Sequence, residues 1–182
     1  MQPIKHLAIW LSKNSDSKHY LFTFNDLRSI SADLSDAAFK TLLSRTVQAH
    51  ILTRVCRGIY LYVPAQPAEG LLLYHVAALL RADKFNYISL ETALSDQGII
   101  SQIPINWISI MSSGRSNIVS CDEFGTIEFV HTNQKASDLI NQLSYDEQCG
   151  MWRANVKQAL KDMKTTRRNS DLIDWDTANE LI

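Results

Sequence analysis

The most informative pattern of hydrophobic and polar positions lies between residues 35 and 50. Apolar positions there recur with the period of an α-helix, and at about 100° per residue one side gathers Phe39, Leu42, Leu43, Thr46 and Val47. The opposite side is small, polar or cationic and gathers Ala37, Thr41, Ser44, Arg45 and Gln48, with Lys40 at the border. Ser35 is the expected N-cap, because its hydroxyl can accept a hydrogen bond from a free amide of the first turn. The pattern predicts a helix with one buried face and one polar face.

The residues upstream of this helix predict three shorter elements. An amphipathic helix is expected over residues 3–13 and a short strand over residues 21–24. A second short helix follows over residues 25–30, with Asn25 as its N-cap, and a turn occupies residues 31–33. The chain therefore presents two consecutive helices joined by a tight turn.

A β-hairpin is predicted downstream of the longer helix. Residues 51–56 and 59–63 are β-rich runs joined at Arg57 and Gly58, and glycine suits the positive φ that a tight turn requires. The strand near residues 21–24 is expected to pair with this hairpin as a third strand. Helix, turn, helix and hairpin in this order predict a winged helix-turn-helix, an arrangement that reads DNA.

The polar face of the helix suits the major groove of DNA, where Arg and Gln can hydrogen-bond to base edges. We expect Arg45 and Gln48 to contact bases, and the cations of the helix border and hairpin to hold phosphates. The predicted DNA-binding residues are Ser35, Lys40, Thr41, Ser44, Arg45, Gln48, Arg54 and Arg57. Strand alternation leaves the face of Arg54 ambiguous, and a solvated face of an ordinary helix is the alternative interpretation.

Two prolines within residues 64–67 mark a domain boundary. We expect a DNA-binding domain over residues 1–63 and a second domain over residues 67–182. The second domain is predicted to contain helices over residues 68–83, 90–97, 135–143 and 145–164, and β runs over residues 106–111, 117–121 and 126–130 in a small antiparallel sheet or meander. The predicted fold class is α+β: an N-terminal winged helix-turn-helix followed by a mixed domain of helices and a small antiparallel sheet.

Formal charge is divided unevenly along the chain. Residues 1–63 hold eight Lys or Arg and four Asp, whereas residues 64–182 hold ten Lys or Arg and fifteen Asp or Glu. A basic N-terminal portion favours nucleic-acid binding, and uneven sampling of a near-neutral chain is the alternative explanation. Further basic residues that are candidates for a nucleic-acid or partner contact are Arg115, Lys157, Lys161, Lys164, Arg167 and Arg168.

Residues that typically carry catalysis or bind metal are present without the required spacing. Cys56, Cys121 and Cys149 are isolated from one another and from histidine, so neither a zinc site nor a disulfide framework is expected. The histidines and carboxylates form no paired motif. We therefore expect no enzymatic activity, no cofactor and no metal. No signal peptide or membrane span is expected, and the protein is predicted to be cytoplasmic.

Two segments resemble a known family. Arg57-Gly58-Ile59-Tyr60 closes the hairpin, and the segment over residues 87–94, YISLETAL, is followed by Gly98. In this order they resemble the R-G-[IV]-Y and YxSLxxAL...G patterns of the AbiEi-type antitoxins of bacterial abortive-infection (type IV toxin–antitoxin) systems.

That resemblance implies a transcriptional autorepressor that binds inverted repeats in double-stranded DNA upstream of its own operon. It also implies an antitoxin that counters a nucleotidyltransferase-like toxin, commonly without a stable toxin complex. The alternative function is a protein-interaction module that neutralises a partner by direct binding.

Overall fold

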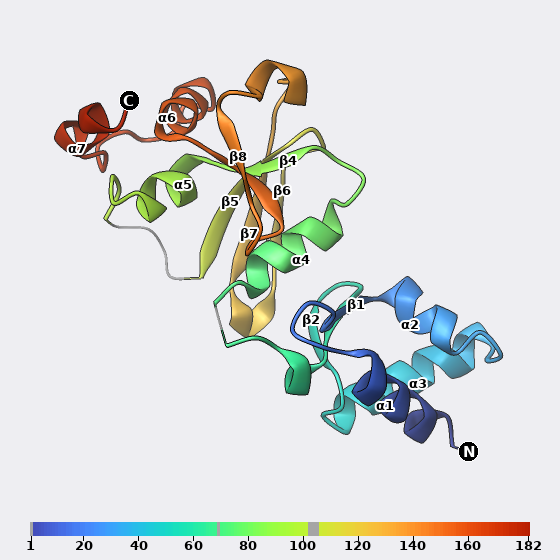
Figure 1. Cartoon of the computed structure of the whole chain (residues 1–182). Helices are drawn as coiled ribbons and strands as arrows, with labels where there is room; N and C mark the ends of the chain where they lie inside the picture. The colour runs from blue at the N-terminus through green and yellow to red at the C-terminus, as the bar shows by residue number, and fades with distance from the viewer. Residues whose placement is uncertain (1, 69, 102–105) are drawn as a thin grey trace. The chain divides into compact units, whose positions relative to one another are not determined.

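A computed structural model describes residues 2–68, 70–101 and 106–182 of the chain (Figure 1). Its residues fall into two compact units, Met1–Gly70 and Leu71–Ile182. Helices and strands are present in both units, and the predicted α+β class is confirmed. Each unit has a sheet of its own.

Three helices form the frame of the N-terminal unit. They are α1 (Pro3–Asn14), α2 (Phe24–Ile30) and α3 (Asp36–Gln48). Their apolar faces meet in one cluster of buried residues, which comprises Leu7, Leu11, Phe22, Leu27, Phe39, Leu42, Leu43 and Leu52. The helical period of α3 therefore predicted its buried face, with Val47 half-buried at its edge.

A three-stranded antiparallel sheet completes this unit. Its strands are β1 (Leu21–Thr23), β2 (Thr53–Cys56) and β3 (Ile59–Leu61), in the order β1-β3-β2. The expected pairing of the first strand with the hairpin is confirmed, because β1 pairs with β3. A short 3-10 helix, η1 (Val63–Ala65), follows.

The ends of the two consecutive helices are set by local hydrogen bonds. Ser35 caps α3 as predicted, since its side chain accepts from the amide of Ala38. The expectation for α2 is wrong: Thr23, not Asn25, is the N-cap, because Thr23 and Asp26 form a reciprocal capping box. This earlier cap places Asn25 inside the helix.

The C-terminal unit is built on a six-stranded mixed sheet, which is larger than the sheet predicted from the sequence. Its strand order is β6-β7-β5-β4-β9-β8. The strands are β4 (Asn86–Ile88), β5 (Trp107–Ser112), β6 (Asn117–Ser120), β7 (Thr126–His131), β8 (Leu143–Asp146) and β9 (Met151–Ala154).

Two sequence-based expectations fail in this sheet. The proposed meander is wrong because β5 pairs with β7 in parallel, while β6 pairs with β7 from the other side. The helices expected over residues 135–143 and 145–164 are also wrong in their extent. Those residues contain a 3-10 helix, η3 (Ala136–Leu139), and the hairpin β8–β9, in which Gly150 adopts a positive φ of 64°.

Helices lie against both faces of this sheet. They are α4 (Leu72–Leu80), α5 (Leu90–Asp96), α6 (Val156–Thr165) and α7 (Trp175–Glu180), and η2 (Asp122–Phe124) is a further 3-10 turn. The buried face of α4 consists of Leu72, Leu73, Val76 and Ala77, whereas Leu79 is exposed.

Strand register assigns the two main helices to opposite faces. Tyr87 pairs with Met111 of β5, and Met111 pairs with Val130 of β7, so these three side chains share one face of the sheet. Phe129 is next to Val130 in β7 and therefore points to the opposite face. Tyr87 meets the Gln134–Asp162 cluster on the α6 side, whereas Phe129 lies under Arg81 at the end of α4.

Candidate nucleic-acid interface

The predicted DNA-binding residues of α3 lie on the side of the helix that faces solvent. Lys40, Thr41, Ser44, Arg45 and Gln48 are all exposed, and so is the N-cap Ser35. Ser35 is already engaged in capping, which limits what its hydroxyl offers to a ligand. The face contains no large apolar side chain, as an approach to a DNA groove requires.

A groove lies between one flank of α3 and the hairpin β2–β3. It has a volume of about 320 Å³ and is lined by Phe24, Lys40, Leu43, Ser44, Val47, Gln48, Arg54 and Tyr60. Two predicted cations, Lys40 from the helix and Arg54 from the hairpin, therefore share one groove. Ser44 and Gln48 add neutral hydrogen-bonding groups to the same surface.

A β-bulge decides the orientation of Arg54. Arg54 pairs with Tyr60 and Cys56 pairs with Ile59, so that Val55 is the extra residue in β2. Strict alternation breaks here: Val55 and Cys56 are both buried, and Arg54 is exposed. The bulge thus frees Arg54 to line the groove beside α3.

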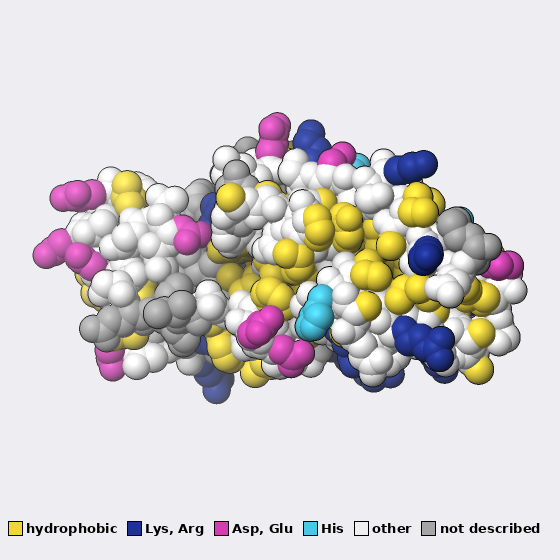
Figure 2. Space-filling view, turned by 90° about the horizontal axis from the view of Figure 1, so that it is seen from below, with side chains coloured by type: hydrophobic (Ala, Val, Ile, Leu, Met, Phe, Trp, Pro, Cys, Tyr) yellow, Lys and Arg dark blue, Asp and Glu magenta, His cyan; other side chains and the backbone are white. Residues whose placement is uncertain are grey.

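The other flank of α3 forms a second groove. Thr41 and Arg45 line it together with Pro3 and Ile4 of α1, and its volume is about 470 Å³. Arg45 and Gln48, which the sequence grouped as base-reading residues, are both exposed and lie about one helical turn apart on α3, but Gln48 lines the groove beside the hairpin and Arg45 lines the groove beside α1. Figure 2 shows Lys and Arg side chains interspersed with hydrophobic ones over the face of the N-terminal unit that is turned to the viewer.

The hairpin turn is short and is anchored to the start of α2. Gly58 has a positive φ of 83°, and its carbonyl oxygen accepts a hydrogen bond from the amide of Phe24. Arg57, the remaining predicted contact, is exposed at this turn and lines neither groove of α3.

Arg28 organises the turn between α2 and α3, a role that the sequence analysis missed. Its Nη1 donates to the carbonyl oxygen of Ser31 at 2.7 Å, and its Nη2 donates to that of Leu34 at 2.8 Å. The guanidinium also lies 5.4 Å from the ring centroid of Phe39. An Arg in the last turn of a short helix before a polar turn was the available signal.

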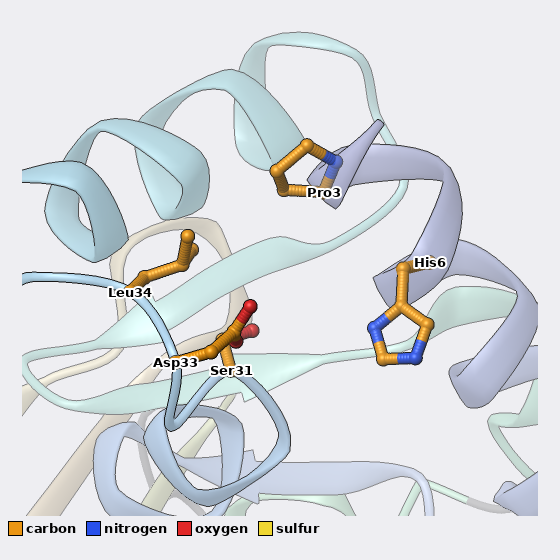
Figure 3. A pocket seen from close by; sticks show the side chains of 5 residues that line it. All are labelled: Pro3, His6, Ser31, Asp33 and Leu34. Carbon is orange, nitrogen blue, oxygen red and sulfur yellow. The ribbon is translucent and has the colours of Figure 1, made fainter. Parts of the chain in front are cut away.

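A pocket of about 340 Å³ opens beside the same turn and is lined by Pro3, His6, Ser31, Asp33 and Leu34. Figure 3 shows the imidazole of His6 on α1 and the carboxylate of Asp33 on the turn directed toward the space between them. Over the described part of the chain, no three His, Cys, Asp or Glu side chains gather as a metal site would require.

The basic residues of the C-terminal unit have different environments. Lys157, Lys161 and Lys164 are exposed on α6, and Arg167 is exposed after its end. Arg168 is held internally by Glu128 at 2.6 Å and Glu91 at 3.5 Å. Arg115 is exposed in the β5–β6 loop, where its carbonyl oxygen accepts from Arg81.

A buried polar network lies under α6. The carboxylate of Asp162, which is fully buried, accepts hydrogen bonds from Ser89 at 2.7 Å, Gln158 at 2.8 Å and Gln134 at 3.0 Å. Burial, reinforced by the charge of Asp162, raises the pKa of Tyr87 well above its usual range. The network joins α6 to the β4–α5 corner, and among these residues only Gln134 is partly exposed.

Neither a scan against models of protein families nor a search of the curated proteins finds a match. Within residues 2–68, 70–101 and 106–182, no helix has both the length and the apolar character needed to cross a membrane.

Proposed function

We propose that the N-terminal unit is a winged helix-turn-helix that binds double-stranded DNA, with α3 in the major groove and the hairpin β2–β3 against the sugar-phosphate backbone. The observation that carries the proposal is the groove shared by α3 and the hairpin. There Lys40 and Arg54 flank Ser44 and Gln48, so that cations for phosphates stand beside neutral groups for base edges.

The proposed contacts with DNA come from residues on both sides of α3. A helix lying in the major groove exposes both of its flanks to the walls of the groove. On the hairpin flank, Gln48 is the base-reading residue and Arg54 the phosphate contact. On the α1 flank, Arg45 is the base-reading residue. Arg57 contacts phosphate from the hairpin turn.

We further propose that the protein represses its own operon at inverted repeats and acts as the antitoxin of a type IV toxin–antitoxin system. This part of the proposal is supported by the resemblance of Arg57–Tyr60 and of residues 87–94 to AbiEi-type antitoxins. The partner countered is a nucleotidyltransferase-like toxin. The basic N-terminal portion supports the DNA-binding half of the assignment.

An electrophoretic shift with the DNA directly upstream of the gene tests the DNA-binding half. We expect the protein to bind this fragment more tightly than a shuffled fragment of equal length. The logarithm of the binding constant should fall with the logarithm of salt concentration by about 0.9 for each phosphate contacted. Lys40→Ala and Arg54→Ala should weaken binding, whereas Lys18→Ala removes an exposed cation that lines neither groove and should leave binding unchanged. Equal losses in all three variants would refute the interface.

Co-expression tests the antitoxin half separately. The toxin and the full chain are expressed from foreign promoters, so that repression of the operon is irrelevant to survival. Restored growth supports the assignment, and unrestored growth refutes it without affecting DNA binding. Co-purification of the toxin with the chain would favour neutralisation by direct binding.

A further inference from the structure

A basic groove with an apolar floor lies in the C-terminal unit, between α6 and the segment that leads into α7. Its volume is about 530 Å³, and it is lined by Leu160, Lys161, Met163, Lys164, Arg167, Arg168, Ser170, Ile173 and Trp175. All of its charged lining residues are cations. We call this surface the α6 groove.

The far wall of the α6 groove is fixed to the sheet domain by specific contacts. Ile173 forms an isolated antiparallel bridge with Ile100, and the amide of Asp174 donates to the carbonyl oxygen of Ile99 at 2.9 Å. The wall is therefore an anchored part of the fold.

Three of the groove cations are available to an external ligand. Lys161, Lys164 and Arg167 are exposed, and across the described residues no carboxylate lies within salt-bridge distance of them. Arg168 is already neutralised by Glu91 and Glu128. The groove thus combines an apolar floor with unneutralised positive charge, which fits an acidic amphipathic segment.

The chain itself carries such a segment. Residues 176–182, which lie beyond the residues that line the groove, include Asp176 and Glu180 and no Lys or Arg. They also expose two large apolar side chains, Leu181 at 50% and Ile182 at 61%. Figure 2 shows acidic side chains at the end of the view where α7 lies. We call residues 176–182 the acidic segment.

We propose that two copies of this chain associate by docking the acidic segment of each copy into the α6 groove of the other. Because groove and segment are both present on every copy, a two-fold axis satisfies both contacts at once. Asp176 and Glu180, which lie one helical turn apart on α7, supply the acidic contacts to Lys161 and Lys164. Asp174 is occupied as the N-cap of α7. The inference does not depend on DNA binding or on the antitoxin assignment.

Charge reversal in the full-length protein tests the proposal, with molecular mass measured by sedimentation equilibrium in the absence of DNA. The groove variant carries Lys161→Glu and Lys164→Glu, and the segment variant carries Asp176→Lys and Glu180→Lys. Each change acts twice in a symmetric dimer, so we expect the dimer dissociation constant of each variant to rise on the order of a hundredfold.

Mixing the two variants gives the decisive result. In the mixed pair, a reversed groove meets a reversed segment and a native groove meets a native segment, so both contacts are attractive. An equimolar mixture is therefore expected to form dimers at concentrations where each variant alone is monomeric. Lys157→Glu is the matched control, because Lys157 is exposed on α6 and does not line the groove. This control should dimerise as the native chain does.

Three results would overturn the proposal. A native chain that remains monomeric throughout the concentration range has no such interface. A groove variant that dimerises like the native chain excludes the α6 groove. A mixture that remains monomeric, while circular dichroism shows both variants folded, means that the acidic segment is not the occupant of the groove.

Discussion

Arg28 offers the sharpest test of how the two consecutive helices are held. Its guanidinium donates to the carbonyl oxygens of Ser31 and Leu34, reaches Asp36 at 3.3 Å and lies beside the ring of Phe39. Replacement of Arg28 by Ala removes all four interactions at once. We therefore expect Arg28→Ala to lower the free energy of unfolding of the N-terminal unit.

The magnitude follows from the environment of each partner. Hydrogen bonds from a charged donor contribute about 1.5–3 kcal/mol each, and the lower end applies because the Arg28 side chain keeps 28% exposure. The pair with Asp36 adds under about 0.5 kcal/mol, since the Asp36 side chain is 86% exposed. We expect about 3 kcal/mol for Arg28→Ala and about half of that for Arg28→Lys, whose single ammonium cannot span both carbonyls.

Urea unfolding of residues 1–70, followed by circular dichroism, provides the measurement. Asp36→Ala is the matched control, because it removes only the exposed partner, and it should cost under about 1 kcal/mol. If Arg28→Ala costs no more than Asp36→Ala, the two carbonyl contacts do not stabilise the turn and the reasoning fails.

Three further predictions concern the DNA interface, a helix terminus and a thiol. In the proposed complex, Arg45→Ala should cost about 1–3 kcal/mol of binding free energy and relax the sequence preference at one base position. Arg54→Ala should weaken binding to all DNA sequences alike and reduce the slope of log binding constant against log salt by about one. If Arg45→Ala leaves the sequence preference in a footprint unchanged, the assignment is wrong. His50 has a φ of 54° at the end of α3, where glycine is favoured, so His50→Gly should raise the free energy of unfolding by about 0.5–1 kcal/mol in a urea titration; a loss of stability would show that His50 makes a compensating contact. Burial raises the pKa of the Cys149 thiol from 9.0 to about 11. The stability that the protonated thiol gives the folded state is therefore fully present below pH 9.0 and is lost as the pH rises through the pKa of the folded state. Mass spectrometry should find Cys149 unmodified by iodoacetamide at about pH 8 until urea unfolds the chain; modification at the rate of a free thiol would refute its burial.

Most helices and strands of the N-terminal unit are predicted from the sequence because their signals are local. Ser35 lies at the start of α3, and the apolar period of that helix identifies its buried face. Gly58 marks the hairpin turn. The misplaced cap of α2 was also a local matter, since Thr23 and Asp26 have the spacing of a capping box and outweigh the isolated Asn25.

The sheet of the C-terminal unit depends on contacts that no local pattern contains. Strand β9 (Met151–Ala154) lies between β4 and β8 and runs parallel to β4, a partner distant in the sequence. Its residues directly precede the amphipathic α6 and were included in the helix expected over residues 145–164. Tertiary pairing overrides that local preference.

In the candidate interface, the sequence predicted which residues are exposed, but it did not predict which other elements lie beside them. A helical period separates the buried side of α3 from its exposed side, and the predicted contacts on α3 are exposed. The helical period does not predict which element lies beside each exposed residue: Gln48 lines the groove beside the hairpin, and Arg45 lines the groove beside α1. The bulge at Val55 likewise lies outside strict strand alternation, which explains the ambiguity at Arg54.

The two segments that carry the family resemblance have different physical roles. Arg57–Tyr60 forms the hairpin turn and places Tyr60 in the groove beside α3. In residues 87–94, by contrast, Tyr87, Ser89, Leu90 and Leu94 are fully buried, and the Ser89 hydroxyl donates to Asp162. This second segment therefore specifies the junction of β4, α5 and α6, and its one partly exposed side chain, Glu91, is paired with Arg168. The antitoxin role proposed above would therefore depend on exposed residues outside this segment.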